Sequence, residues 1–272
     1  MLGEYVVFPA LGWIFDLATH AFGVKPDLNA ANIGFGELRN FFTALVCTEL
    51  FAIYERRRVD SYGLRLEAAL RSPTFEGVAV GVAVTGFVAL GMIALGGMHV
   101  HGLALSGSTL FASALAWLAA NISVGIAEEF WFRSYFQQTL WKSIGFWPSS
   151  IVIALIFAAE HYFYKQGENI GDVVMLVWFS LLASYSVLRT GMLWFAVGFH
   201  IAFDYMQLFV IGTPNGGAIP AGRLLNVAFT GPAWLTGGVL GTEASFLVYP
   251  AMAFASLYVW WRYRANPASV AQ

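Results

Sequence analysis

Three segments of the sequence place ionisable side chains within stretches that are otherwise apolar. Their ionisable members are Glu128, Glu129, Arg133, Glu160, His161, His200 and Asp204. Carboxylates and imidazoles are the groups that most often move protons in catalysis. A charge near the centre of a membrane costs about 2.5–3.5 kcal/mol on the insertion scale, so it is seldom retained without a use. These residues are therefore the candidates for a chemical function.

The first segment separates a paired carboxylate from an unpaired one. Glu129 and Arg133 are four residues apart, so on a helix they share a face and can form an ion pair. Glu128 is rotated from Glu129 by about 100° and cannot share that partner equally well. A poorly hydrated carboxylate without a partner is a strong proton acceptor, which suits a general base. The alternative is a helix that ends at the membrane surface with its charges in water.

The other two segments each have a structural explanation as well. His161 can make a hydrogen bond between helices, and Glu160 can be a solvated charge at a helix end. His200 and Asp204 are four residues apart, so Asp204 can simply accept a hydrogen bond from the imidazole. Three such clusters on three separate apolar segments are hard to explain by packing alone, and together they favour a site.

The composition predicts that these segments lie in a membrane. Of 272 residues, 58% are hydrophobic and 11% are charged, whereas soluble domains carry roughly 25% charged residues. A chain of this size cannot bury so much apolar surface in one water-soluble core. The net charge of -2 offers no basic field to nucleic acid, and the single Cys47 excludes a disulfide framework or a thiolate metal cluster.

The expected fold class is all-α, a polytopic membrane bundle of about seven or eight transmembrane helices, since a span takes about 20 residues. We expect spans near 33–54, 75–98, 109–127, 148–163, 172–188, 192–211 and 238–261. Residues 5–23 are an eighth span or an interfacial helix. The interspersed leucines and arginines of 55–73 predict an interfacial helix, and the turn residues of 212–237 predict a loop. We expect one membrane-embedded domain over 1–272, with its motif-bearing core at about 109–211.

The cations predict an orientation through the positive-inside rule. They gather in alternate connections, as Arg56, Arg57, Arg58, Arg65, Arg71, Lys142, Arg189, Arg262 and Arg264. We therefore expect an integral protein of a bacterial inner membrane, with its C-terminus in the cytoplasm.

Together the segments resemble the motifs of a known family. Glu128-Glu129-x-x-x-Arg133, Phe157-x-x-x-His161 and His200-x-x-x-Asp204 are similar, in this order, to the three motifs of the CAAX protease and bacteriocin-processing (CPBP) family of intramembrane proteases, which includes CAAX prenyl protease 2 and the Abi-like proteins. The resemblance covers roughly residues 110–210 and implies a helix bundle around a water-filled cavity.

The resemblance also implies roles for the residues. Glu128 and His161 would activate a water molecule, with Glu129 and Arg133 in support. His200 and position 204 would stabilise the oxyanion. The eukaryotic branch has Asn where this chain has Asp204, and an ionised aspartate is an acceptor only. Either Asp204 is protonated, or it orients His200, or the oxyanion hole is built differently; we favour orientation of His200.

The function expected on this basis is that of a membrane peptidase, a glutamate-type endopeptidase that hydrolyses a peptide bond in or near the bilayer. Its partners would be the lipid bilayer and a peptide or protein substrate, including one lipidated or membrane-anchored at its C-terminus, with no nucleic acid. We expect no cofactor. Zinc is the alternative, held by Glu128, His161 and His200, although no HExxH is present. A proton-coupled carrier and a catalytically idle immunity or scaffold protein are the competing functions.

Overall fold

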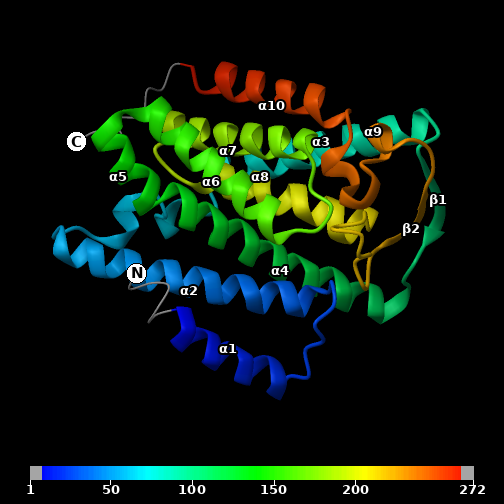
Figure 1. The fold of residues 1–272 in the computed structure, drawn as a ribbon, viewed down its shortest axis with the longest axis horizontal. Coiled ribbons are helices and arrows are strands. Elements are labelled where there is room, and N and C mark those ends of the chain that lie inside the picture. Colours follow the sequence, from blue (N-terminus) through cyan, green and yellow to red (C-terminus); the bar gives the residue numbers. More distant parts are fainter. Residues whose placement is uncertain (1–7, 265–272) are drawn as a thin grey trace.

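The computed structural model describes residues 8–264, which form a bundle of helices with a small two-stranded antiparallel sheet at one end (Figure 1). The α-helices are α1 (Phe8–Ala21), α2 (Ala30–Tyr54), α3 (Ser72–Ala94), α4 (Gly107–Arg133), α5 (Tyr135–Ile144), α6 (Phe146–Tyr164), α7 (Ile170–Thr190), α8 (Trp194–Asp204), α9 (Ala233–Thr236) and α10 (Val248–Arg262). A π-helix, η4 (Tyr205–Ile211), continues α8, and shorter 3-10 turns are η2 (Val59–Tyr62), η3 (Leu66–Ala68) and η5 (Gly238–Ala244). The all-α polytopic bundle is thus confirmed.

Six helical segments of the described chain are long and apolar enough to cross a membrane. They are Ser72–Ala94, Gly107–Ile144, Phe146–Tyr164, Ile170–Thr190, Trp194–Ile211 and Gly238–Arg262. The predicted span at 33–54 is helical as α2, but Glu37, Arg39 and Glu49 interrupt its apolar sequence and it is not among the six. Of the predicted element at 5–23, residues 8–21 form α1 and residues 5–7 lie outside the described part. The expected count of seven or eight was therefore approximate.

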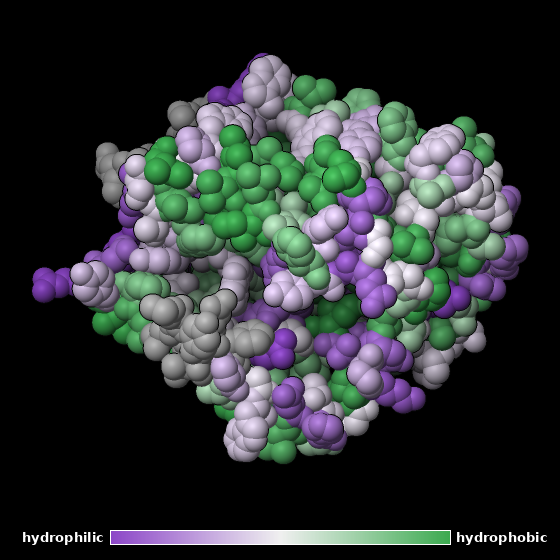
Figure 2. Space-filling model, in the orientation of Figure 1, coloured by the Kyte–Doolittle hydropathy of each residue, from purple (hydrophilic) through white to green (hydrophobic). Residues whose placement is uncertain are grey.

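Much of the outer surface is apolar, as a lipid-facing surface requires. Hydrophobic residues cover large parts of the face seen in Figure 2. Large exposed apolar side chains occur on several helices, for example Trp13 on α1, Phe111 on α4 and Leu257 on α10. Because these helices are long and apolar enough to cross a bilayer, the chain is an integral membrane protein.

Glycines bring α3 and α8 into backbone contact at the centre of the bundle. A Cβ atom added at Gly77 would lie 2.2 Å from the carbonyl oxygen of Phe195, and one at Gly198 would lie 2.2 Å from that of Thr74. Only glycine permits so close an approach. The contact draws α8 into the interior, where nearly all of its residues are buried. His200, two residues after Gly198, is thereby placed inside the bundle.

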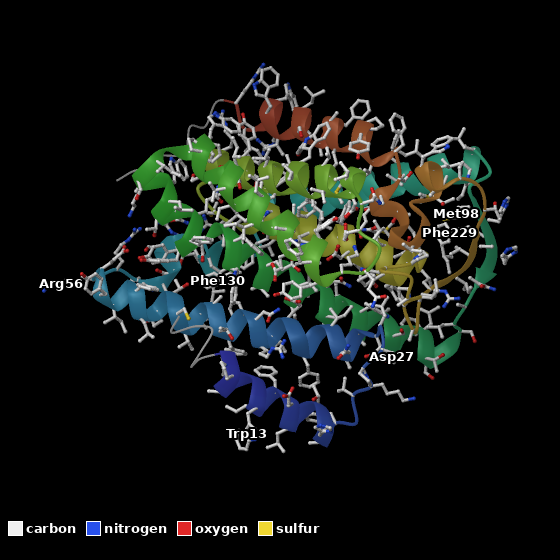
Figure 3. The ribbon with its side chains drawn as sticks, viewed as in Figure 1. Trp13, Asp27, Arg56, Met98, Phe130 and Phe229 are labelled. Atoms are coloured by element: carbon white, nitrogen blue, oxygen red, sulfur yellow. The ribbon has the colours of Figure 1, made fainter. Side chains whose placement is uncertain are left out.

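The segment 212–237 is not wholly a loop, which corrects the sequence prediction. Residues Leu225–Phe229 form strand β2, antiparallel to β1 (Met98–Leu103), with Met98 opposite Phe229 and Leu103 opposite Leu225. The pairing joins residues more than a hundred positions apart, so neither strand could be recognised from its own neighbourhood. Figure 3 shows Met98 and Phe229 at one end of the bundle and Arg56 at the other.

The interfacial helix predicted for 55–73 is also wrong: residues 55–71 contain only the 3-10 turns η2 and η3, and α3 begins at Ser72. Gly63 has φ 100°, which ends the first turn. Two backbone carbonyls of the segment accept from distant side chains: Gln138 Nε2 donates to Tyr62 O at 2.7 Å, and Trp194 Nε1 donates at 2.7 Å to Arg65 O, which also accepts from Ala68 N–H within η3. The Tyr62 hydroxyl donates to Glu55 at 2.9 Å, and burial together with this carboxylate raises the pKa of Tyr62 to about 12.

Candidate functional site

The predicted ion pair at the end of α4 is present and fully buried. Arg133 Nη1 lies 3.3 Å from Glu129 Oε1, and neither side chain is exposed. The guanidinium also lies over the ring of Phe157, 4.7 Å from its centre. An ion pair withdrawn from water in this way is strongly coupled, because removing one partner leaves an uncompensated charge.

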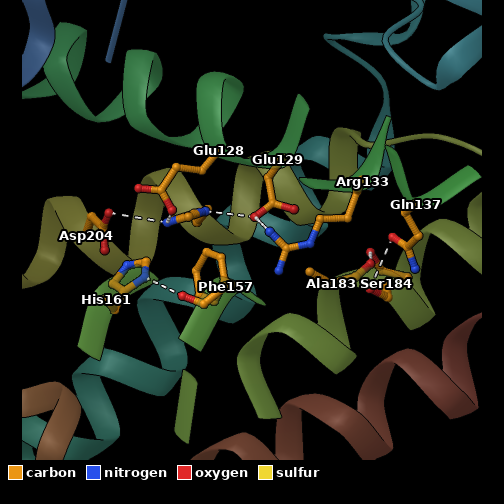
Figure 4. Close-up of polar contacts among 11 residues, drawn as sticks. Glu128, Glu129, Arg133, Gln137, Phe157, His161, Ala183, Ser184 and Asp204 are labelled. Carbon is orange, nitrogen blue, oxygen red and sulfur yellow. Dashed lines mark hydrogen bonds and ion pairs between the residues drawn. The ribbon is translucent and has the colours of Figure 1, made fainter. Parts of the chain in front are cut away.

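This pair anchors an imidazole from α8 (Figure 4). His200 Nδ1 donates to Glu129 Oε1 at 2.8 Å. His200 Nε2 lies 3.5 Å from Asp204 Oδ2 and 3.8 Å from Glu128 Oε2. Carboxylates are acceptors, so an imidazole that carries an N–H on both nitrogens satisfies this surrounding best. The closest carboxylate to His200 is thus Glu129, and Asp204 is on the other side of the ring.

The imidazole of His161, on α6, has a hydrogen-bond acceptor at one nitrogen only, unlike that of His200. Its Nδ1 lies 2.9 Å from the carbonyl oxygen of Phe157. A carbonyl only accepts, so Nδ1 carries the hydrogen and Nε2 of the neutral ring keeps its lone pair. The hydrogen bond lies within α6, one turn back, and it fixes the ring without using Nε2. The ring of Phe157 packs against the imidazole with 4.5 Å between centres.

Two cavities, here called the narrow and the wide cavity, meet at Glu128 and His161. The narrow cavity has a volume of about 300 Å³ and is lined by residues of α2, α4, α6, α7, α8 and the segments after η4. The wide cavity, of about 870 Å³, lies between α2, α4 and α6. Glu37, Glu128, His161 and Lys165 line both cavities. His200 and Asp204 line the narrow cavity.

Glu128 is partly exposed, unlike Glu129, and it has a carboxylate oxygen without a hydrogen-bond partner. Its side chain is 21% exposed, against 0% for Glu129. Its buried Oε2 has no hydrogen-bond partner. The helix rotation predicted from the sequence thus separates a fully buried, paired Glu129 from a Glu128 that lines both cavities. All four residues predicted to act on the substrate, Glu128, His161, His200 and Asp204, line the narrow cavity.

Other ionisable residues beside the cavities did not enter the predicted site. Glu160 lines the wide cavity, and Glu37 reaches both cavities from α2. Lys165 Nζ contacts Glu243 and lies 3.6 Å from Glu168. The sequence signal for Glu37 is a carboxylate within an apolar run, the same signal that identified Glu128, but no spaced partner accompanies it.

Within the described residues, one group of acidic side chains is close enough to share a metal ion. The ligand atoms of Glu168, Asp172 and Glu243 lie within 4.8 Å of one another. Lys165 already supplies this group with a positive charge. None of its members belongs to the set that the sequence offers to zinc.

Comparison with known proteins bears on the same region of the chain. Residues 110–206 match the family model described as Rce1-like, type II CAAX prenyl endopeptidase. The matched range contains Glu128, Glu129, Arg133, His161, His200 and Asp204, and it does not include α2. A search of curated proteins gave no match.

Proposed function

We propose that this membrane protein, whose residues 110–206 match the family model described as Rce1-like, type II CAAX prenyl endopeptidase, hydrolyses peptide bonds with a water molecule activated by Glu128 and His161. One observation carries the proposal. Both side chains line the space where the two cavities meet, and each has a free acceptor, Glu128 Oε2 and His161 Nε2. A water between two such acceptors would be held and polarised for attack.

The proposed reaction balances with these groups alone. Glu128 takes one proton from the water as its oxygen bonds to the peptide carbonyl carbon, while His161 Nε2 accepts a hydrogen bond from the remaining O–H. The carbonyl oxygen becomes an oxyanion and receives a hydrogen bond from His200 Nε2–H. Glu128 then gives its proton to the departing nitrogen as the carbon–nitrogen bond breaks, which leaves a carboxylic acid and an amine.

The remaining residues would hold His200 in the form that can donate. Glu129 binds Nδ1 and is itself held by Arg133. We propose that Asp204 orients the ring from its Nε2 side, where the two atoms are 3.5 Å apart. Before substrate binds, Nε2–H faces Asp204 and Glu128, and the developing oxyanion would take over this donor.

We propose that the water is activated without a metal ion. One feature supports this: His200 Nε2, which zinc would need as a ligand, faces the carboxylates of Asp204 and Glu128 and is best satisfied there as an N–H donor. Zinc on Glu128, His161 and His200 is the competing proposal, and it requires His200 Nε2 to give up its hydrogen.

We further propose a substrate anchored in the bilayer near the scissile bond, in a bacterial inner membrane. The wide cavity combines aromatic walls, such as Phe51, Trp131 and Phe136, with the polar groups at the junction, so it suits a peptide with an apolar or lipidated segment. The clustered cations support a cytoplasmic position for residues 55–71 and the C-terminus.

The test compares protein termini in cells that express the wild-type chain, Glu128→Gln or Glu49→Gln, by mass spectrometry of membrane and secreted fractions. Glu49 is an exposed carboxylate of α2 that lines neither cavity, so it controls for loss of a charge. We expect new termini with wild type and Glu49→Gln, and at least about a hundredfold fewer with Glu128→Gln. Equal termini with all three folded proteins would overturn the peptidase proposal.

A second arm decides on the metal. The substrate identified by its new terminus is incubated with purified protein that has been dialysed against a chelator. Unchanged cleavage supports direct activation by Glu128 and His161. Loss of cleavage that zinc restores would replace it with the zinc proposal.

A further inference from the structure

Glu37 is a carboxylate of the site that comes from outside the matched residues. It lies on α2, which runs beside α4 (Figure 1). The side chain is half-buried and lines both cavities together with Glu128 and His161. Asn40 Nδ2 donates to Glu37 Oε2 at 3.3 Å, which ties one oxygen to a neutral amide on the next turn. Glu37 and Glu128 therefore border the same space, which a substrate of Glu128 would enter.

The charges around the narrow cavity are unbalanced in favour of carboxylates. Its lining includes Glu37, Glu128, Asp204 and Glu243, with Lys165, His161 and His200 as the basic side chains. Lys165 is engaged by Glu243 and Glu168, and His200 by Glu129 on one side and Asp204 on the other. His161 is the ring that donates to its own helix. Glu37 and Glu128 also line the wide cavity, whose cationic side chains are Arg39 and Lys165.

Carboxylates in a poorly hydrated space are stabilised by any cation that enters it. An ammonium or guanidinium group can also donate hydrogen bonds to a carboxylate, and these charge-assisted bonds are stronger than neutral ones. An acidic side chain beside Glu37 and Glu128 would meet repulsion from both carboxylates. The cavity therefore discriminates between substrates by the sign of their charge.

We propose that Glu37 is a specificity-determining residue, which binds a lysine or arginine side chain of the substrate beside the scissile bond. The inference rests on the proposed peptidase function, and it adds the substrate class: membrane-associated peptides with a basic residue at a fixed position near the cleavage site. Glu128 acts on the water, whereas Glu37 contacts the substrate side chain.

A purely structural role for Glu37 gives a different expectation. Glu37→Gln keeps the size of the side chain and an oxygen that can accept from Asn40, so a structural role would survive it. Binding of a cation would not, because the amide is neutral. Glu49→Gln is the matched control, since it removes one negative charge from the same helix at an exposed position.

The first experiment analyses the sequences around the new termini for wild type, Glu37→Gln, Glu37→Lys and Glu49→Gln. We expect lysine or arginine to be enriched at one position for wild type and Glu49→Gln. Glu37→Gln should lower cleavage of these substrates about tenfold relative to neutral ones, and Glu37→Lys should favour acidic residues there. Termini without a charge preference, or an equal loss for all substrates in Glu37→Gln, would overturn the inference and leave the peptidase proposal standing.

The second experiment measures binding without cleavage. Cys47 is the single cysteine of the chain and lines the wide cavity, so the rate of its reaction with a maleimide reports on occupancy. Two synthetic apolar peptides that differ only by Lys or Gln at one position are added to the Glu128→Gln protein. We expect the Lys peptide to slow labelling at about tenfold lower concentration, and the additional change Glu37→Gln to abolish the difference. Equal labelling with both peptides would overturn the inference. A difference in labelling, found where no variant produces termini, would uphold the cation site while the peptidase proposal fails.

Discussion

The two imidazoles of the site differ in what their nitrogens face. His161 has one nitrogen bonded to a carbonyl and one with a free lone pair. His200 has carboxylates on both sides of the ring. The same side chain is thus arranged as an acceptor in one place and as a donor in the other, and water activation and oxyanion stabilisation need these two opposite properties.

Asp204 gives a prediction at this scale. Asp204→Asn keeps an oxygen that can accept from His200 Nε2 and adds an N–H donor near the expected oxyanion. We expect Asp204→Asn to cleave the identified substrate within a few-fold of wild type, and Asp204→Leu to lose about a hundredfold. Initial rates of purified protein on that substrate measure both. If the Asn variant is as slow as the Leu variant, the negative charge itself is needed, and orientation of the ring by a hydrogen bond is not its role.

Spacing along a helix predicted some of these contacts and could not predict others. Glu129 and Arg133 are one turn apart on one helix, so their pairing follows from the sequence and is confirmed. The bond from His200 to Glu129 joins α8 to α4. It depends on how the two helices cross, and no local pattern carries that information. The roles of Glu128, His161, His200 and Asp204 in catalysis stay predictions.

At the scale of elements, the position of the site depends on how α8 packs against α3. This helix touches the backbone of α3 through glycines, and it carries His200 two residues beyond Gly198. Apolar length predicted both helices from the sequence. The depth at which α8 is buried depends instead on Gly77, Gly81 and Gly198, whose lack of a side chain matters only once the helices are paired.

A pair of glycine substitutions tests this packing. Gly198→Ala places a methyl group 2.2 Å from the carbonyl oxygen of Thr74, so α8 and α3 must separate. We expect a loss of about 1–3 kcal/mol in stability, as for overpacking, together with reduced cleavage. Gly86→Ala on α3 is the control, because its Cβ would meet nothing within 4 Å. Thermal unfolding in detergent compares the two, and equal stability of both variants would contradict the close approach.

Sequence patterns failed where an element depends on a distant partner. The β1–β2 sheet pairs two short segments, Met98–Leu103 and Leu225–Phe229, that lie more than a hundred positions apart, so the sequence around each strand does not show its partner. The segment 55–71 has an amphipathic composition, yet its carbonyls are bonded to α5 and to the start of α8. In both cases long-range hydrogen bonds override the local preference.

At the scale of the whole molecule, the two ends of the bundle differ in charge and structure. The arginine-rich segment 55–71 and the end of α10 lie at one end, where Arg262 contacts Glu76 at 2.9 Å. The β1–β2 sheet lies at the opposite end (Figure 1). Residues 265–272, with the predicted cytoplasmic C-terminus, lie outside the described part of the chain.

The positive-inside rule converts this asymmetry into a prediction of orientation. In a Cys47→Ala background, Glu67→Cys places a thiol in the arginine-rich segment and His101→Cys places one in strand β1, and both positions are exposed. A membrane-impermeant maleimide should label His101→Cys in intact cells and Glu67→Cys only after lysis, because arginines are retained on the cytoplasmic side. Labelling of both variants after lysis shows that each thiol can react. Labelling of Glu67→Cys in intact cells would reverse the orientation, and the substrate's basic residue would then have to reach Glu37 from the other side of the membrane.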